Sequence, residues 1–441
     1  MRTVSFKTYA LAGVIGFFIG LRLLGPALGL LYIGAAILCI YFAFKSDTRR
    51  VLISLAYVVY TEIFIRKGAG VTFIPYLFVQ YLMIGVFFIM LIRKGGQLKI
   101  HSRSTLLIFL YTVIEILDMI RAQDITYARS MLTNTIVLLL ITLWASANAL
   151  TPQMMDSIIK HVKIATIYLC GNILVAHFTH EITYSATSSS EASNWMSAVQ
   201  LSGYMGVGCS MFFLSVMNEK EKDKLFVNIL LFALSVTLMV LTFSRGGLYF
   251  LSAVIILYVL FNRKHVGRFL ILFLLLPVGY IVYYYVTTTT GGLIEERFGE
   301  EGASGREDLV KAGFEIFMHE PLAGVGTGNF NTQITERGLF SAESGAHNEF
   351  VRAAAEHGVM GIIFYWGFYV IIFIELLSRK KEEREMAFYL LVIYCLIIVH
   401  NGLKISIQPY ILALIVATPS LVRVYKKKNV SAFSHLPSAT P

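Results

Sequence analysis

Charged side chains are scarce in this chain. Of its 441 residues, 15% are Asp, Glu, Lys or Arg while 56% are hydrophobic, and the mean hydropathy is +0.69. A soluble protein of this length needs more charge to cover its surface. Apolar runs of about 20 residues recur along the sequence, and such runs become helices because hydrocarbon offers the backbone no hydrogen bonds. Short alternating segments, as in outer-membrane barrels, are absent. The composition predicts an all-α polytopic membrane protein.

Cysteine is also sparse, and the sequence lacks an acidic metal motif. Cys39, Cys170, Cys209 and Cys395 each lie inside an apolar run, too far apart to suggest a metal knuckle. We expect them to be small buried hydrophobes. No Asp-x-Asp occurs, which argues against a nucleotide-sugar glycosyltransferase with a carboxylate-bound metal. Neither a metal nor a cofactor is expected.

The net charge of +10 comes from short basic clusters between the apolar runs. This distribution is typical of cytoplasmic loop anchors, so no nucleic-acid partner is expected. With alternating spans the clusters fall on one side of the membrane. The positive-inside rule therefore predicts that both termini are cytoplasmic and that the protein is multi-pass. The clusters lie at residues 45–50, 93–103, 160–163, 220–224, 263–268, 379–384 and 426–428.

The hydropathy pattern predicts about 12–14 transmembrane spans. The N-terminal stretch has no convincing small-x-small cleavage site, so we interpret it as the first span rather than a signal peptide. The predicted spans are residues 8–24, 27–44, 51–66, 71–92, 104–120, 131–150, 162–178, 198–217, 225–243, 247–262, 268–287, 359–377, 386–401 and 405–423.

Four regions follow from this pattern. N-terminal transmembrane helices occupy 1–240, a central region occupies 241–365, C-terminal transmembrane helices occupy 366–424, and 425–441 form a cytoplasmic tail. The central region contains one large, partly helical loop at 287–358, predicted to be extracytoplasmic. Within it, residues 305–318 predict an amphipathic helix, because Leu309, Ala312, Gly313, Ile316 and Phe317 recur at helical spacing. Pro321 ends that helix, and a second begins near His347.

The sequence Ser244-Arg245-Gly246-Gly247 closes the ninth predicted span on the loop side. The two glycines predict a tight turn that holds Arg245 toward an outward cavity. An arginine at a membrane boundary also snorkels to lipid headgroups without any further role. The residues alone leave both interpretations open.

Arg306 opens the amphipathic loop helix beside Glu307 and Asp308. The acidic pair suits the positive end of the helix dipole, whereas the arginine gains nothing from it. Arg306 is therefore either a solvated surface residue or the binding partner of another group.

Residues 324–330 (GVGTGNF) form a glycine-rich turn with Gly324, Gly326, Gly328 and Asn329. Such a turn can present backbone N–H groups to a phosphate, and these four residues are substrate-binding candidates on that ground. No Lys-Ser/Thr follows it, so it is not a P-loop. A purely structural turn is the alternative.

His347 and Asn348 precede a pair of glycines, Gly358 and Gly361. A histidine titrates near neutral pH and can take a proton from a sugar hydroxyl, although a lone loop histidine is more often a bystander. Asn348 and Arg352 are substrate-binding candidates beside it. Several titratable residues, among them Glu115, Asp118 and His400, lie inside predicted spans but close to their ends.

Taken together and in this order, these elements resemble the O-antigen ligase and polymerase superfamily, whose members share a Wzy_C region. The elements are Ser244–Gly247, Arg306 with the following His319-Glu320-Pro321-Leu322, the turn at 324–330, and His347-Asn348 followed by Gly358-x-x-Gly361. The resemblance spans about residues 240–365. The rest of the chain is similar only in being a many-helix membrane domain.

The resemblance implies a GT-C-like, metal-independent membrane glycosyltransferase of the bacterial inner (plasma) membrane. Its donor would be a glycan on undecaprenyl diphosphate, and the acceptor hydroxyl would belong to another glycan or to lipid A–core, as in lipopolysaccharide and cell-envelope polysaccharide synthesis. Arg245 and Arg306 would hold the diphosphate with Ser244, and His347 would orient or deprotonate the acceptor. A chain-length regulator and a flippase would be further partners.

Three alternatives stay open at this stage. A repeat-unit polymerase is the favoured reading, and a ligase to lipid A–core is its first rival. From another class, a secondary transporter or flippase of lipid-linked glycan would predict pseudo-symmetric halves, and none is evident. A cell-shape or division glycosyltransferase fits the arginine and histidine set less well.

Overall fold

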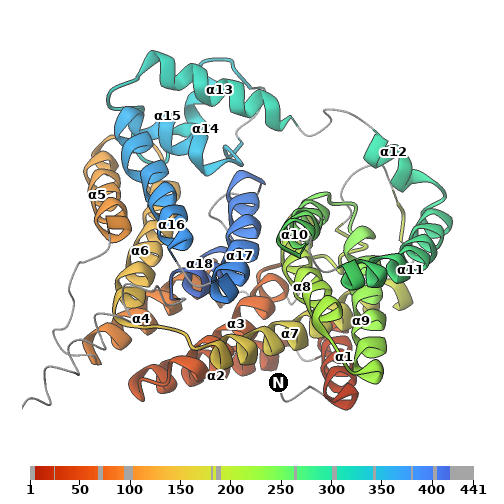
Figure 1. Cartoon of the computed structure of the whole chain (residues 1–441). Helices are drawn as coiled ribbons and strands as arrows, with labels where there is room; N and C mark the ends of the chain where they lie inside the picture. The colour runs from red at the N-terminus through yellow and green to blue at the C-terminus, as the bar shows by residue number, and fades with distance from the viewer. Residues whose placement is uncertain are drawn as a thin grey trace, which may run out of the picture.

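The computed structural model describes residues 5–23, 25–67, 73–93, 103–179, 182–184, 190–262, 266–299, 305–340, 344–378, 381–400 and 405–417. Helices make up most of these residues, and the described part of the chain contains no strand, which confirms the all-α prediction. Figure 1 shows the helices gathered into a bundle, with α13, α14 and α15 grouped at the top of the view. The predicted tail at 425–441 lies outside the described residues.

The helices follow one another in the order α1 (Phe6–Gly20), α2 (Gly25–Phe44), α3 (Thr48–Lys67), α4 (Phe78–Arg93), α5 (Arg103–Asp118), η1 (Met119–Arg121), α6 (Ile125–Ala147), α7 (Pro152–Thr179), α8 (Ala198–Asn218), α9 (Lys222–Val240), α10 (Gly246–Asn262), α11 (Val266–Thr290), α12 (Leu293–Gly299), α13 (Arg306–His319), α14 (Phe330–Glu336), α15 (Glu349–Gly361), η2 (Ile362–Trp366), α16 (Gly367–Leu377), α17 (Lys381–His400) and α18 (Ile407–Val416).

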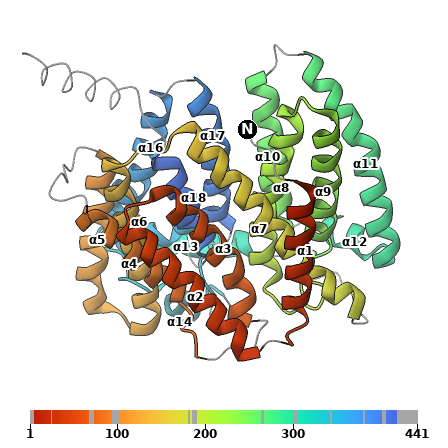
Figure 2. The ribbon, with the colours of Figure 1, turned by 90° about the horizontal axis from the view of Figure 1, so that it is seen from below.

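Every predicted span overlaps one of these helices. Six helical segments of the described chain are both long and apolar enough to cross a membrane: α2, α6, α7, α8, α9 and the continuous run Glu349–Leu377. Four more apolar helices, α1, α4, α10 and α18, have only 10–17 described residues. A polytopic membrane protein is therefore confirmed, while six full-length candidates are fewer than the 12–14 spans predicted. Figure 2 shows many of the helices running in a shared direction, with α7 crossing obliquely among them.

Helix α7 corrects one sequence prediction. Residues 160–163 were expected in a basic loop, but α7 begins at Pro152 and contains them. Lys163 is partly buried, and its ammonium donates to Ser215 Oγ at 2.9 Å and to Asn228 Oδ1 at 3.3 Å. Polar partners on α8 and α9 thus stabilise a lysine that hydropathy alone assigns to the end of a span.

Small residues bring α1 and α7 into close contact. A Cβ on Gly16 would lie 1.9 Å from the carbonyl oxygen of Tyr168, and one on Gly171 would lie 2.0 Å from that of Gly13. The two backbones therefore touch directly, as in membrane helix pairs with small residues at the crossing. This contact fixes the N-terminal helix against the longest helix of the bundle.

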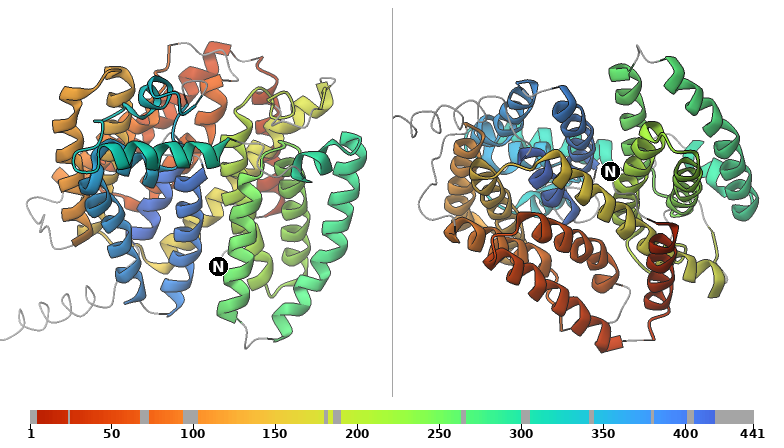
Figure 3. Two further views of the ribbon diagram at one scale, coloured as in Figure 1. Left: turned by 90° about the horizontal axis from the view of Figure 1, so that it is seen from above. Right: turned by 60° about the horizontal axis from the view of Figure 1, so that its bottom comes forward.

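The large loop has a hydrophobic core of its own. Leu309, Ala312 and Ile316 of α13 are buried as the helical spacing predicted, whereas Phe317 is only half-buried. They pack with Phe330 and Ile334 of α14 and with the first turns of α15. We call α13, α14 and α15 the loop module. In Figure 3, α13 runs across the other helices rather than along them.

We predict that Gly171→Ala lowers the free energy of unfolding by about 1–3 kcal/mol, because the new methyl group overpacks the α1–α7 contact. Thermal unfolding of the purified protein measures the loss. The control is Gly34→Ala on α2, where no atom lies within 4 Å of the added Cβ. The control should melt like the wild type or slightly higher, given alanine's helix propensity. Equal melting of both variants would contradict this account of the packing.

Candidate active site

A sharp turn joins α9 to α10 and carries Ser244 and Arg245. Phe243 adopts a positive φ of 58°, which reverses the chain directly after α9. The hydroxyl of Ser202, on α8, donates to the Ser244 carbonyl oxygen at 3.1 Å and accepts from Gly247 N–H at 2.8 Å. One buried serine therefore forms hydrogen bonds to the backbone on both sides of the turn. Arg245 is half-exposed between these two fixed points.

Close packing explains the second glycine of this turn. A Cβ on Gly247 would lie 2.3 Å from the carbonyl oxygen of Ser202, and one on Gly206 would lie 2.6 Å from the Cα of Gly247. Helices α8 and α10 therefore meet backbone to backbone immediately after Arg245. The predicted tight turn is present, and its rigidity comes from this contact.

Arg306 is the first residue of α13, and its Nη1 contacts the Nε2 of His400. His400 is the last residue of α17 and is half-buried. The partner that the sequence indicated for Arg306 is thus a histidine from a helix about ninety residues further along the chain. The Arg306 side chain thus points away from the positive end of its own helix dipole and contacts the negative, C-terminal end of α17.

His400 also lies against the turn that follows Arg245. A Cβ on Gly246 would stand 3.0 Å from the imidazole Cε1 and 3.1 Å from Nδ1. The ring of Tyr249, on α10, meets the imidazole edge to face at 5.9 Å between centroids. The imidazole thus links Arg306 to the α9–α10 turn, so two predicted cationic elements come together. Sequence reasoning gave His400 no role, and its place at the end of a span was the only available signal.

His347 lies in the loop directly before Asn348, the N-cap of α15. It precedes α15, its side chain is exposed, and its φ of 49° is in the left-handed region. Left-handed backbone in a non-glycine residue is uncommon and clusters at functional sites. Helix α15 packs against both α13 and α17, the helices that carry Arg306 and His400.

The glycine-rich turn packs closely against neighbouring backbone. Gly324, Gly326 and Gly328 all have positive φ. A Cβ on Gly324 would lie 2.3 Å from the backbone of Glu356, and one on Gly328 would lie 2.8 Å from that of Ala128. The N–H groups of Gly324, Val325 and Gly326 donate to carbonyl oxygens at 2.8–3.1 Å. Donors used within the protein are not presented to a phosphate.

The two asparagines and Ser244 are likewise occupied within the chain. Asn329 accepts from the N–H of Gln123 and donates to the carbonyl oxygens of Arg121 and Val325, each at 2.8 Å. Asn348 caps α15 by accepting from two backbone N–H groups. Ser244 is buried. These contacts hold loops in place, so we leave all three residues out of the proposed substrate contacts.

Arg352 is buried and surrounded by carboxylates. Its nitrogens lie 2.6 Å from Glu349, 2.5 Å from Glu356 and 3.3 Å from Glu115 of α5. We call these four residues the Arg352 cluster. This buried, neutralised guanidinium attaches the loop module to α5, so we leave Arg352 out of the proposed substrate contacts.

His357 extends the Arg352 cluster toward the end of α5. Its Nδ1 lies 2.7 Å from Asp118, and its ring meets Tyr111 edge to face. The next residue, Gly358, breaks the helix at φ 59°, and Val359 N–H donates to the Pro321 carbonyl oxygen at 2.8 Å. The motif glycine and the motif proline therefore meet in one joint.

Residues 230–366 match the protein-family model described as O-antigen ligase. The predicted resemblance to the O-antigen ligase and polymerase superfamily is thus confirmed over the part of the chain that carries the α9–α10 turn and the loop module. No curated protein matches the chain.

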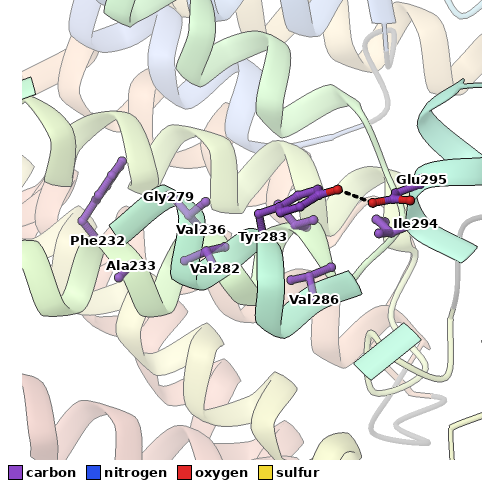
Figure 4. A pocket seen from close by; sticks show the side chains of 10 residues that line it. Phe232, Ala233, Val236, Gly279, Val282, Tyr283, Val286, Ile294 and Glu295 are labelled. Atoms are coloured by element: carbon purple, nitrogen blue, oxygen red, sulfur yellow. Dashed lines mark hydrogen bonds between the residues drawn. The ribbon is translucent and has the colours of Figure 1, made fainter. Parts of the chain in front are cut away.

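One apolar pocket of about 360 Å³ lies within the matched region, between α9, α11 and α12. Figure 4 shows Tyr283 and Glu295 hydrogen-bonded at one end of it, with valines of α9 and α11 along its walls. None of the predicted site residues lines it. Within the described residues, no group of three or more His, Cys, Asp or Glu side chains is arranged to hold a metal ion.

We predict that Arg352→Met lowers the free energy of unfolding by about 3–5 kcal/mol, because it leaves three carboxylates buried around a neutral side chain. Thermal unfolding of the purified protein in detergent measures the loss. Lys311→Met is the matched control, since Lys311 pairs with Asp308 on the exposed face of α13. If both variants melt alike, the Arg352 cluster does not anchor the loop module.

Proposed function

We propose that the protein is a membrane glycosyltransferase of the O-antigen ligase and polymerase type, which transfers a glycan from undecaprenyl diphosphate to an acceptor hydroxyl. The observation that carries the proposal is the meeting of Arg306, His400 and the Arg245 turn. These three elements come from α13, α17 and the α9–α10 junction, and the last of them and α13 fall within the O-antigen ligase match.

Arg306 contacts His400, and Arg245 precedes the glycine that His400 touches; such a pair of arginines suits a lipid-linked diphosphate. The glycan is already activated, so the chemistry needs no nucleotide sugar. As the bond between the anomeric carbon and the diphosphate oxygen breaks, negative charge grows on the leaving group. Arg245 and Arg306 would stabilise that charge by charge-assisted, bidentate hydrogen bonds in a partly dry environment.

The acceptor hydroxyl oxygen would attack the anomeric carbon directly, which inverts its configuration. His347 would orient the hydroxyl or take its proton as the new glycosidic bond forms, and undecaprenyl diphosphate would leave. The exposed position of His347 supports this role, because an acceptor must reach it from water. The proton would then pass from the imidazole to solvent.

We place the reaction at the outer face of the plasma membrane, with both termini in the cytoplasm, as the basic clusters indicate. The favoured acceptor is a second lipid-linked repeat unit, which makes the protein a polysaccharide polymerase. A ligase to lipid A–core would use the same cations and the same histidine, so the two activities differ by acceptor alone.

The decisive experiment supplies purified protein in lipid nanodiscs with lipid-linked repeat units, first alone and then with lipid A–core. Chain growth without the core would support the polymerase, and transfer only to the core would identify a ligase. Movement of glycan lipid across a vesicle bilayer with no transfer in either case would refute the enzyme and favour the flippase.

We predict that Arg245→Ala, Arg306→Ala and His347→Ala each lower the transfer rate at least about 100-fold, as removal of a transition-state contact does. Lys311→Ala serves as control, because it removes an exposed cation of the same loop module. Its rate should stay within about twofold of the wild type. Normal transfer by all three variants would refute the proposed site.

A further inference from the structure

His400 holds a place between Arg306 and the α9–α10 turn that none of the sequence motifs accounts for. We propose that His400 is a positioning residue: its imidazole accepts a hydrogen bond from Arg306 and aims the guanidinium at the site beside Arg245. This inference rests on the proposed function, because it assumes that Arg306 holds the lipid diphosphate.

The direction of the hydrogen bond follows from the chemistry of the two groups. A guanidinium has five N–H donors and no acceptor, and it stays charged at any physiological pH. The Nε2 atom that meets Arg306 Nη1 must therefore be the acceptor, with the proton of the neutral ring on Nδ1. A protonated imidazole would lose this lone pair and would repel the guanidinium.

The surroundings hold the imidazole in one orientation. The absence of a side chain at Gly246 leaves room for the Cε1–Nδ1 edge, and Tyr249 contacts the ring from α10. His400 contacts the charged Arg306 of α13 and the titratable Tyr249 of α10. The His400 ring is thus held by helices of the bundle, while Arg306, which donates to it, belongs to the loop module.

This arrangement matters because a long arginine side chain loses entropy when it is fixed. If His400 fixes Arg306 before the donor arrives, the guanidinium meets the diphosphate already oriented. Loss of His400 should then weaken both donor binding and the stabilisation of the leaving group, and should leave the acceptor side unchanged. A residue with a merely structural role would affect both substrates and the folded state together.

The test compares two substitutions in the full-length protein. His400→Phe keeps an aromatic ring against Tyr249 and Gly246 but removes the acceptor, and His400→Gln restores an acceptor oxygen. We expect His400→Phe to lower kcat/KM for the donor about 10- to 100-fold, the range for a hydrogen bond to a charged group, with the acceptor KM unchanged. His400→Gln should recover to within about threefold. Lys311→Ala, on the exposed face of α13, is the control.

A double mutant isolates the pathway through Arg306. Because residues that act together are non-additive, His400→Phe should lower the rate less than about twofold further in an Arg306→Ala background. Wild-type donor kinetics in His400→Phe would overturn the proposal. So would equal losses in His400→Phe and His400→Gln with a reduced melting temperature, since that pattern indicates a structural role.

A binding measurement separates this inference from the proposed function. Undecaprenyl diphosphate alone is titrated into nanodiscs of each variant, and we expect about tenfold weaker binding to His400→Phe but not to His400→Gln. A wild-type protein that neither binds this lipid nor transfers glycan would refute the proposed function. A wild-type protein that does both, with His400→Phe equal to it, would refute only the role of His400.

Discussion

A buried guanidinium holds the loop module onto the transmembrane helices, and the rest of the site depends on this attachment. Arg352 pairs with Glu349 and Glu356 of its own helix and with Glu115 of α5. Charges removed from water tolerate few geometries, because every one of them must keep its partner. The joint therefore sets the register of α15 against α5. Since α13 packs on α15, the same joint also fixes the position in space of the first residue of α13, which is Arg306.

Most of the motif residues build this scaffold, and few are left over for chemistry. Gly324 and Gly358 interlock the proline turn with α15, and Gly247 lets α8 and α10 touch. These glycines matter because they have no side chain, and the backbone of a neighbouring segment occupies the space that a side chain would take. Once these roles are assigned, Arg245, Arg306 and His347 are the predicted site residues that we keep for the proposed chemistry.

The sequence was sufficient for the helices because hydrocarbon permits little else. Each of the fourteen predicted spans overlaps a helix of the described chain, and the spacing of Leu309, Ala312 and Ile316 correctly predicted the buried face of α13. The sequence was insufficient wherever the position of a charged side chain depends on a partner that is distant along the chain. Lys163 stays inside α7 because Ser215 and Asn228 receive it, and Arg306 finds His400 across the fold. Periodicity describes one helix at a time, so it contains no information about such pairs.

The position of the site at helix ends reconciles two opposing demands on charge. A guanidinium deep in hydrocarbon costs several kcal/mol, while one in bulk water binds a diphosphate weakly. Arg245 follows α9 and Arg306 opens α13, so neither lies in the middle of a span. His400, the last residue of α17, contacts Arg306 and lies against Gly246, and the dipole of α17 favours a cation at that end. A lipid whose tail is apolar and whose diphosphate is charged requires the same boundary. In the proposed function, both arginines would therefore lie at the depth where burying a charge costs little and a diphosphate is still bound strongly.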